Sequence, residues 1–115
     1  MYLTYNLTTA QAATLDATLR DMVRSHQRRT RILRAVDLAH RDHTNRSMAD
    51  TVASLASAVD AHADGHTIHD PATNTAVQNF ARWARTDSGG DPDAVRDNLH
   101  DDRDDLHRLH GKLTA

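Results

Sequence analysis

The chain has 115 residues, 38% of them hydrophobic, and a formal net charge of −2, which suits one domain or one domain with an arm and excludes two large domains. It contains no cysteine, which excludes disulfides, thiolate zinc sites and cysteine nucleophiles, and we expect a reducing, cytoplasmic compartment. Residues 1–46 form a basic segment with a net charge of +4 and residues 47–115 an acidic segment with a net charge of −6, and we expect the two to pack as one domain.

The first residues of the chain have the pattern of a short strand. Leu3, Tyr5 and Leu7 alternate with the residues between them, which is the period-2 pattern of a half-buried strand or extended arm. No partner strand is evident elsewhere in the sequence. The segment lacks the basic start and apolar stretch of a signal peptide, and no apolar run approaches the ~20 residues that span a bilayer. We therefore expect neither export nor a membrane partner.

One long helix or two shorter helices are predicted between residues 9 and 40. Thr8 or Thr9 can cap the start, and the apolar face that follows comprises Leu15, Leu19, Met22, Val23 and His26. The apolar stripe weakens across residues 25–30 and resumes at Ile32. The pattern leaves two alternatives open, a single helix to about His40 or two helices that meet near residues 24–29.

Three further helices are predicted from their capping signals. Ser47 precedes an apolar 4-3-4-3 pattern, and Gly65 suits a left-handed stop. Asp70-Pro71 and Asp91-Pro92 each place a capping acid before a proline at the first helical position. The last helix has a heptad seam of Val95, Leu99, Asp102, Leu106, Leu109 and Leu113. Its one acid must lie at an edge of the contact or meet a base, because an unpaired buried carboxylate is costly.

The scarcity of aromatic residues favours helices. The chain has two Tyr, one Phe and one Trp, so Leu, Val, Met and Ala must fill the core, which suits closely approaching helices better than a sheet sandwich. We predict an all-α fold of four or five antiparallel, bundle-like helices, preceded by a short N-terminal extended arm or strand.

The order of elements in residues 2–40 resembles the ribbon-helix-helix family of DNA-binding proteins. The resemblance is carried by the strand-like Tyr2-Leu-Thr-Tyr-Asn-Leu7, a helix from about Thr9 to Val23, a polar link, and Thr30-Arg-Ile-Leu-Arg-Ala-Val-Asp-Leu-Ala39. In that family two chains pair their strands into a ribbon that enters the major groove. The resemblance implies a homodimer, with alternate strand residues facing base edges and a second helix that starts at Thr30 and holds a phosphate.

Arginines of the basic segment supply a second argument for DNA. On a continuous helix Arg20, Arg24, Arg28 and Arg31 fall within about 80° of one another, as in a stripe that tracks phosphates or in an ordinary solvated face. A basic segment can equally meet the acidic segment of its own chain or of a second copy. We predict a small, dimeric DNA-binding regulator whose affinity falls steeply with salt. Its predicted contact residues are Tyr2, Thr4, Asn6, Arg24, Arg28, Arg29, Thr30 and Arg31.

The acidic last helix gives an alternative function. A helical-bundle adaptor or inhibitor could bind a basic protein in the manner of a nucleic-acid mimic. The residues predicted for that role are Asp97, Asp101, Asp104 and Asp105. The alternative is that these acids form an ordinary solvent-exposed helix face with no partner.

Metal binding and catalysis find little support. The nine histidines include pairs at helical spacing, His40/His43, His62/His66 and His107/His110, but no His-Glu-x-x-His arrangement, so we predict surface histidines without a metal or cofactor. There is no glycine-rich phosphate loop and no Gly-x-Ser-x-Gly turn. We therefore predict that the protein is not an enzyme.

Overall fold

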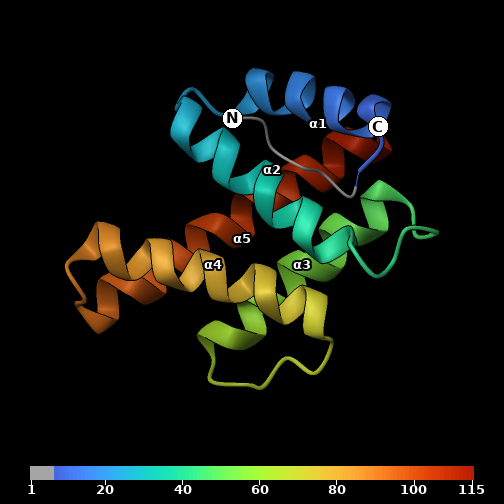
Figure 1. Cartoon of the computed structure of the whole chain (residues 1–115). Coiled ribbons are helices and arrows are strands. Elements are labelled where there is room, and N and C mark those ends of the chain that lie inside the picture. Colours follow the sequence, from blue (N-terminus) through green and yellow to red (C-terminus); the bar gives the residue numbers. More distant parts are fainter. Residues whose placement is uncertain (1–6) are drawn as a thin grey trace, which may run out of the picture.

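The computed structural model describes residues 7–115, and within this range the fold is all-α. Five helices follow one another as α1 (Thr9–Met22), α2 (His26–His40), α3 (Met48–Ala63), α4 (Pro71–Ser88) and α5 (Pro92–Thr114) (Figure 1). None of the helices in this range combines the length and the apolar character that a membrane crossing requires. The predicted strand or arm, with Tyr2, Thr4 and Asn6, lies outside the described residues.

Each helix begins where the sequence supplies an acceptor oxygen. The side chain before the first helical residue accepts a hydrogen bond from a backbone N–H of the first turn, and the five capping residues are Thr8, Ser25, Ser47, Asp70 and Asp91. Such a contact satisfies one of the amides that a helix start leaves unpaired. Gly65 follows α3 with a φ of +85°, a left-handed conformation that glycine adopts without strain. The predicted starts of α1, α3, α4 and α5 are confirmed.

A break between α1 and α2 decides between the two alternatives for residues 9–40. Val23 and Ser25 have extended backbone angles, with ψ values of 117° and 119°. The Arg29 guanidinium spans the break and donates to the carbonyl oxygens of Val23 at 2.7 Å and Arg24 at 2.8 Å. Two helices are present, and the second starts at His26 rather than at Thr30, because Ser25 supplies the cap one turn earlier.

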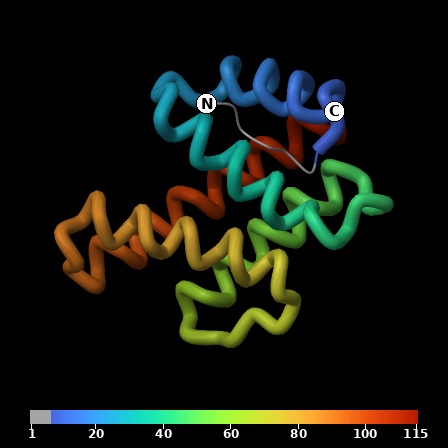
Figure 2. The backbone as a smooth tube through the Cα atoms, viewed as in Figure 1, coloured from blue at the N-terminus to red at the C-terminus, as the bar shows by residue number. Residues whose placement is uncertain are grey.

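A single cluster of buried apolar side chains includes residues of all five helices. The most extensive helix contact is that of α3 with α5, and Val52, Leu55 and Val59 of α3 and Leu106 and Leu109 of α5 are fully buried. α2 and α4 pack against each other, and α4 also packs on both helices of this pair while α2 packs on α3. α1 lies on α2 and α5, and Figure 2 shows it beside the C-terminal end of α5. The expectation of a bundle-like, all-helical fold is confirmed.

A buried polar cluster connects the start of the described chain to α2 and α3. The Leu7 backbone N–H donates to Asp37 Oδ1 at 3.1 Å. His40, which is 1% exposed, lies with its Nδ1 atom 3.1 Å from the Thr51 hydroxyl oxygen. Burial lowers the pKa of His40, which favours the neutral ring at neutral pH. His40 is therefore a core residue rather than the surface histidine predicted from the sequence.

Leu55→Ala tests the α3–α5 contact. Leu55 has no exposed surface, so its truncation loses transfer free energy and leaves a cavity. We expect the free energy of unfolding to fall by about 2–5 kcal/mol in urea titrations. The control, Ser57→Ala, changes an exposed residue of the same helix and should stay within about 0.5 kcal/mol of the wild type. Equal stabilities of the two variants would contradict the packing described.

Candidate nucleic-acid interface

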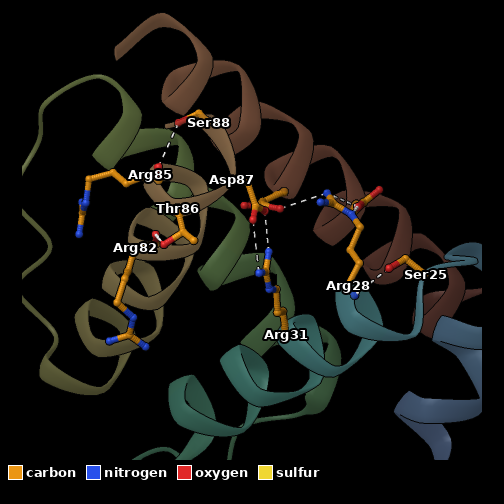
Figure 3. Close-up of polar contacts among 10 residues, drawn as sticks. Ser25, Arg28, Arg31, Arg82, Arg85, Thr86, Asp87 and Ser88 are labelled. Carbon is orange, nitrogen blue, oxygen red and sulfur yellow. Dashed lines mark hydrogen bonds and ion pairs between the residues drawn. The ribbon is translucent and has the colours of Figure 1, made fainter. Parts of the chain in front are cut away.

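The basic segment meets the acidic segment of the same chain where α2 contacts α5. Arg28 on α2 donates from Nε to Asp105 Oδ2 at 2.6 Å, and its Nη2 atom lies 3.0 Å from Asp102 Oδ1 (Figure 3). Asp102 and Asp105 are only 8% and 7% exposed. Arg108 forms a second ion pair with Asp105. The sequence prediction that the acid in the α5 seam lies at an edge or meets a base is confirmed, and the base is Arg28.

The surroundings of Asp102 change its ionisation. Burial is the largest influence and raises its pKa to about 7, with a further increase from the charges of Asp105 and Asp101, whereas the Arg28 guanidinium acts in the opposite direction. Two buried carboxylates share the Arg28 guanidinium here, and burial makes the charged form of Asp102 costly. The α2–α5 contact is therefore sensitive to pH near neutrality.

Arg31 connects α2 to α4 by a second set of contacts. Its Nη1 atom donates to Asp87 Oδ2 at 2.6 Å, and Figure 3 shows the two side chains facing each other across the helices. The guanidinium carbon also lies 5.5 Å from the centroid of the Trp83 ring, which is cation–π geometry. Phe80 meets Trp83 edge to face, with ring centroids 5.7 Å apart. Arg31 is thus held by both an acid and an aromatic ring.

The continuous stripe expected for Arg20, Arg24, Arg28 and Arg31 is not formed. The stripe assumed an uninterrupted helix, whereas the chain leaves the helix at Val23 and re-enters it after Ser25. Two of the arginines then point to acids of the second half of the chain, and Arg20 pairs with Asp16 of its own helix at 3.1 Å. The alternative in which the basic segment meets the acidic segment of its own chain holds for Arg28 and Arg31.

Other cations of the same region keep their charge unpaired. Within residues 7–115, no carboxylate lies at ion-pair distance from Arg24 or Arg34, and both side chains are exposed. His26 and Gln27 are exposed at the start of α2, and Thr30 is half-buried and donates its hydroxyl to the His26 carbonyl oxygen. We call His26, Gln27, Thr30 and Arg34 the basic face of α2, and Arg24 immediately precedes it.

Two hollows adjoin this face. The smaller one, which we call the Trp83 hollow, has a volume of about 310 Å³ and is lined by His26, Gln27, Thr30, Arg31, Arg34 and Trp83. The larger has a volume of about 730 Å³ and lies between α1 and α2, with Ala12, Ala13, Arg29, Thr30 and Leu33 among its lining residues. Leu7, the first residue that the structure describes, also lines the larger hollow. The structure thus brings Arg29 and Thr30 together at one groove, while Arg28 and Arg31 point elsewhere.

The four aspartates of the alternative function do not share one surface. Asp97, Asp101 and Asp104 are exposed on α5, whereas Asp105 is buried against Arg28. Asp104 also pairs with Arg103 at 3.1 Å. A partner that approaches α5 would therefore meet three of these carboxylates at most.

Histidines of the described chain take separate structural positions. His43 Nε2 lies 3.0 Å from Asp70 Oδ2, which joins the α2–α3 connection to the cap of α4. The Thr73 hydroxyl and this contact lower the pKa of Asp70. His40 is buried against Thr51 instead, so the two members of the predicted His40/His43 pair point to different partners. Residues 7–115 hold no cluster of three or more side chains suited to a metal ion.

Sequence reasoning missed Trp83 and Asp87 as parts of this region. Both lie on α4, and their partner Arg31 is on α2, 56 residues from Asp87 in the sequence. The i, i+4 spacing of Trp83 and Asp87 places them on one side of α4 and was the only local signal. This spacing does not identify Arg31 as the partner, because the contact depends on how α2 and α4 cross.

Comparison with known proteins gives no relative on which a function could be based. The chain matches no protein-family model, no curated protein sequence and no solved structure. The functional argument therefore depends on the geometry of this chain alone.

Asp102→Asn tests the pH sensitivity of the α2–α5 contact. The pKa of Asp102 rises from an ordinary 3.8 to about 7 on folding, so ionisation is harder in the folded state and the free energy of unfolding falls as pH rises through this window. Asparagine cannot ionise. We compare the free energy of unfolding of the variant with that of the wild type at each pH. The difference, variant minus wild type, should be larger at about pH 8 than at about pH 5 by at least about 1.4 kcal/mol, the equivalent of one pKa unit.

Urea titrations at the two pH values measure this difference. Asp93→Asn removes an exposed carboxylate of the same helix and is the control for a general charge effect. A difference between Asp102→Asn and the wild type that is independent of pH would show that Asp102 ionises normally.

Proposed function

We propose that the protein is a small, non-enzymatic DNA-binding regulator that acts as a homodimer and holds phosphates with Arg34 of the basic face of α2 and with Arg24. The observation that carries the proposal is the division of the arginines. Arg28 and Arg31 are paired with acids, whereas Arg24 and Arg34 are exposed and have no carboxylate partner in residues 7–115. Within the described chain, this division leaves an unpaired positive charge at Arg34 on α2 and another at Arg24 in the link before it.

Free and paired arginines differ in what they offer a phosphate. An arginine that already donates to a carboxylate must give up that ion pair before it can bind a phosphate oxygen, whereas an exposed, unpaired arginine only releases water and counterions. We therefore assign phosphate binding to Arg24 and Arg34. The other three arginines position α2. Arg28 does so through Asp102 and Asp105, Arg29 through the backbone carbonyls of the link, and Arg31 through Asp87.

The order of the helices supports a regulator of the ribbon-helix-helix kind. Such a protein needs two separate helices after its strand, and the break at residues 23–25 provides them, with Thr8 capping α1 and Ser25 capping α2. In this proposal residues 2–6 pair with those of a second copy, and Tyr2, Thr4 and Asn6 read base edges. Thr30 lies at the groove between α1 and α2, one turn inside α2, and is assigned no phosphate.

Binding of a basic protein by α5 is the second candidate. Asp97 and Asp101 are exposed, and among the described residues neither forms an ion pair. The burial of Asp105 against Arg28 makes this acidic surface smaller than the sequence suggested. The unpaired arginines therefore favour DNA.

Arg24→Ala/Arg34→Ala tests the assignment of the phosphate contacts. We expect this double variant to bind a random 30-base-pair duplex at least about 10-fold more weakly, and the slope of log affinity against log salt to decrease by about two units, because each lost phosphate contact removes about one unit. Fluorescence anisotropy at several salt concentrations measures both quantities.

The matched control is Arg82→Ala/Arg85→Ala. These two exposed arginines of α4 point away from Arg31 in Figure 3, and their loss changes the net charge by the same amount. We expect its affinity to stay within about 3-fold of the wild type. Equal losses in the two double variants would mean that only net charge attracts DNA, and unchanged binding of both would reject the proposed surface.

Thr4→Ala/Asn6→Ala tests the predicted base contacts. A duplex selected from a random library by the wild type should bind the wild type more tightly than random duplex does. Removal of the two side chains should erase that preference while binding to random duplex persists, because base contacts specify and phosphate contacts only position. A variant that keeps the preference would show that these residues do not read sequence.

A further inference from the structure

The Trp83 hollow is a concave surface at the seam of α2 and α4. Its volume of about 310 Å³ is at the lower end of the range for small-ligand sites, enough for one nucleotide and too small for a stacked base pair. Trp83 supplies an aromatic surface that is only partly buried. Among the lining residues, Arg31 has a role in positioning α2. The other polar lining residues have no structural role assigned so far, apart from the hydrogen bond of Thr30 to the His26 carbonyl oxygen.

Contacts of Arg31 and Trp83 with neighbouring side chains hold the hollow in shape. Asp87 fixes the Arg31 guanidinium at 2.6 Å, and this planar group lies over the Trp83 ring at 5.5 Å. Phe80, which is 2% exposed, fixes Trp83 from beneath by an edge-to-face contact. A planar ligand would therefore meet two planar groups that are already positioned, and it would not have to order them on binding.

The rim of the hollow is cationic and polar. Arg34 has no carboxylate partner within residues 7–115, and the exposed side chains of His26 and Gln27 can donate hydrogen bonds. Asp87 pairs with Arg31 of the lining, and no carboxylate is among the described residues that line the hollow. An acidic peptide could use the free charge but not the planar surface. A nucleobase with its own phosphate uses both, because bases stack on aromatic and guanidinium planes.

We propose that the Trp83 hollow binds an unpaired nucleobase, with the adjacent phosphate on Arg34. This inference rests on the proposed function and specifies its ligand, since the DNA that binds there must contain a single-stranded or opened segment. The base stacks against the Trp83 and Arg31 planes, while the basic face of α2 and Arg24 follow the backbone.

Tryptophan fluorescence tests this inference directly, because Trp83 is the only tryptophan in the chain. The titrants are a 15-nucleotide oligo(dT), an abasic oligonucleotide of the same length, and a duplex of the same length. We expect saturable quenching by oligo(dT), with an affinity at least about 10-fold above that of the abasic strand, since stacking contributes about 1–3 kcal/mol per base. Anisotropy of labelled strands measures binding independently of the tryptophan signal.

Variants separate stacking from charge. Trp83→Phe keeps an aromatic ring in the packing and should reduce the preference for oligo(dT) over the abasic strand without abolishing binding. Arg34→Ala should weaken oligo(dT) binding about 3- to 10-fold, and Arg85→Ala, which removes an equally exposed arginine of α4, should leave it unchanged.

Three outcomes would overturn the inference. If oligo(dT) and the abasic strand bind equally, or if oligo(dT) binds without changing the tryptophan signal, the hollow takes no base although DNA binding stands. If poly-aspartate quenches Trp83 as effectively as oligo(dT), the hollow binds an acidic protein segment. If neither the single strands nor the duplex bind, the proposed function fails together with the inference.

Discussion

The pairing of Arg28 with Asp102 and Asp105 is the polar constraint on a core that is largely apolar, because it ties α2 to two buried carboxylates of α5. Burial of two carboxylates is costly unless a base holds them, so α2 must lie where its arginine reaches the α5 seam. α2 packs mainly on α4, where Arg31 reaches Asp87. Two arginines of the basic segment, Arg28 and Arg31, thereby pair with acids of the chain's own acidic segment.

This internal pairing determines which charges remain for a partner. A count of arginines suggests a strongly basic first half, but Arg28 and Arg31 are committed to acids and Arg29 to backbone carbonyls. The exposed charges of Arg24 and Arg34 remain. The same ion pairs hold Arg31 over Trp83, so the positioning of α2 and the shape of the Trp83 hollow have a common origin.

Local features of the fold were predictable from the sequence, and the pairing of distant residues was not. Helix starts depend on one capping side chain and its neighbours, which is why Ser47, Asp70 and Asp91 mark them correctly. Heptad spacing likewise placed Asp102 in the seam and required a base for it. The identity of that base, and the pairing of Arg31 with Asp87, follow from how the helices cross, and periodicity within one helix does not contain this information. The burial of His40 was not predicted for the same reason, because its partner Thr51 belongs to another helix.

Sedimentation velocity of the purified protein, with and without random duplex DNA at low and at raised salt, tests the central claim most directly. It reports self-association and DNA binding in one measurement. The account predicts a dimer that sediments with the duplex at low salt and is released as salt rises, because phosphate contacts displace counterions. A species whose sedimentation is unchanged by duplex at every salt concentration would contradict it.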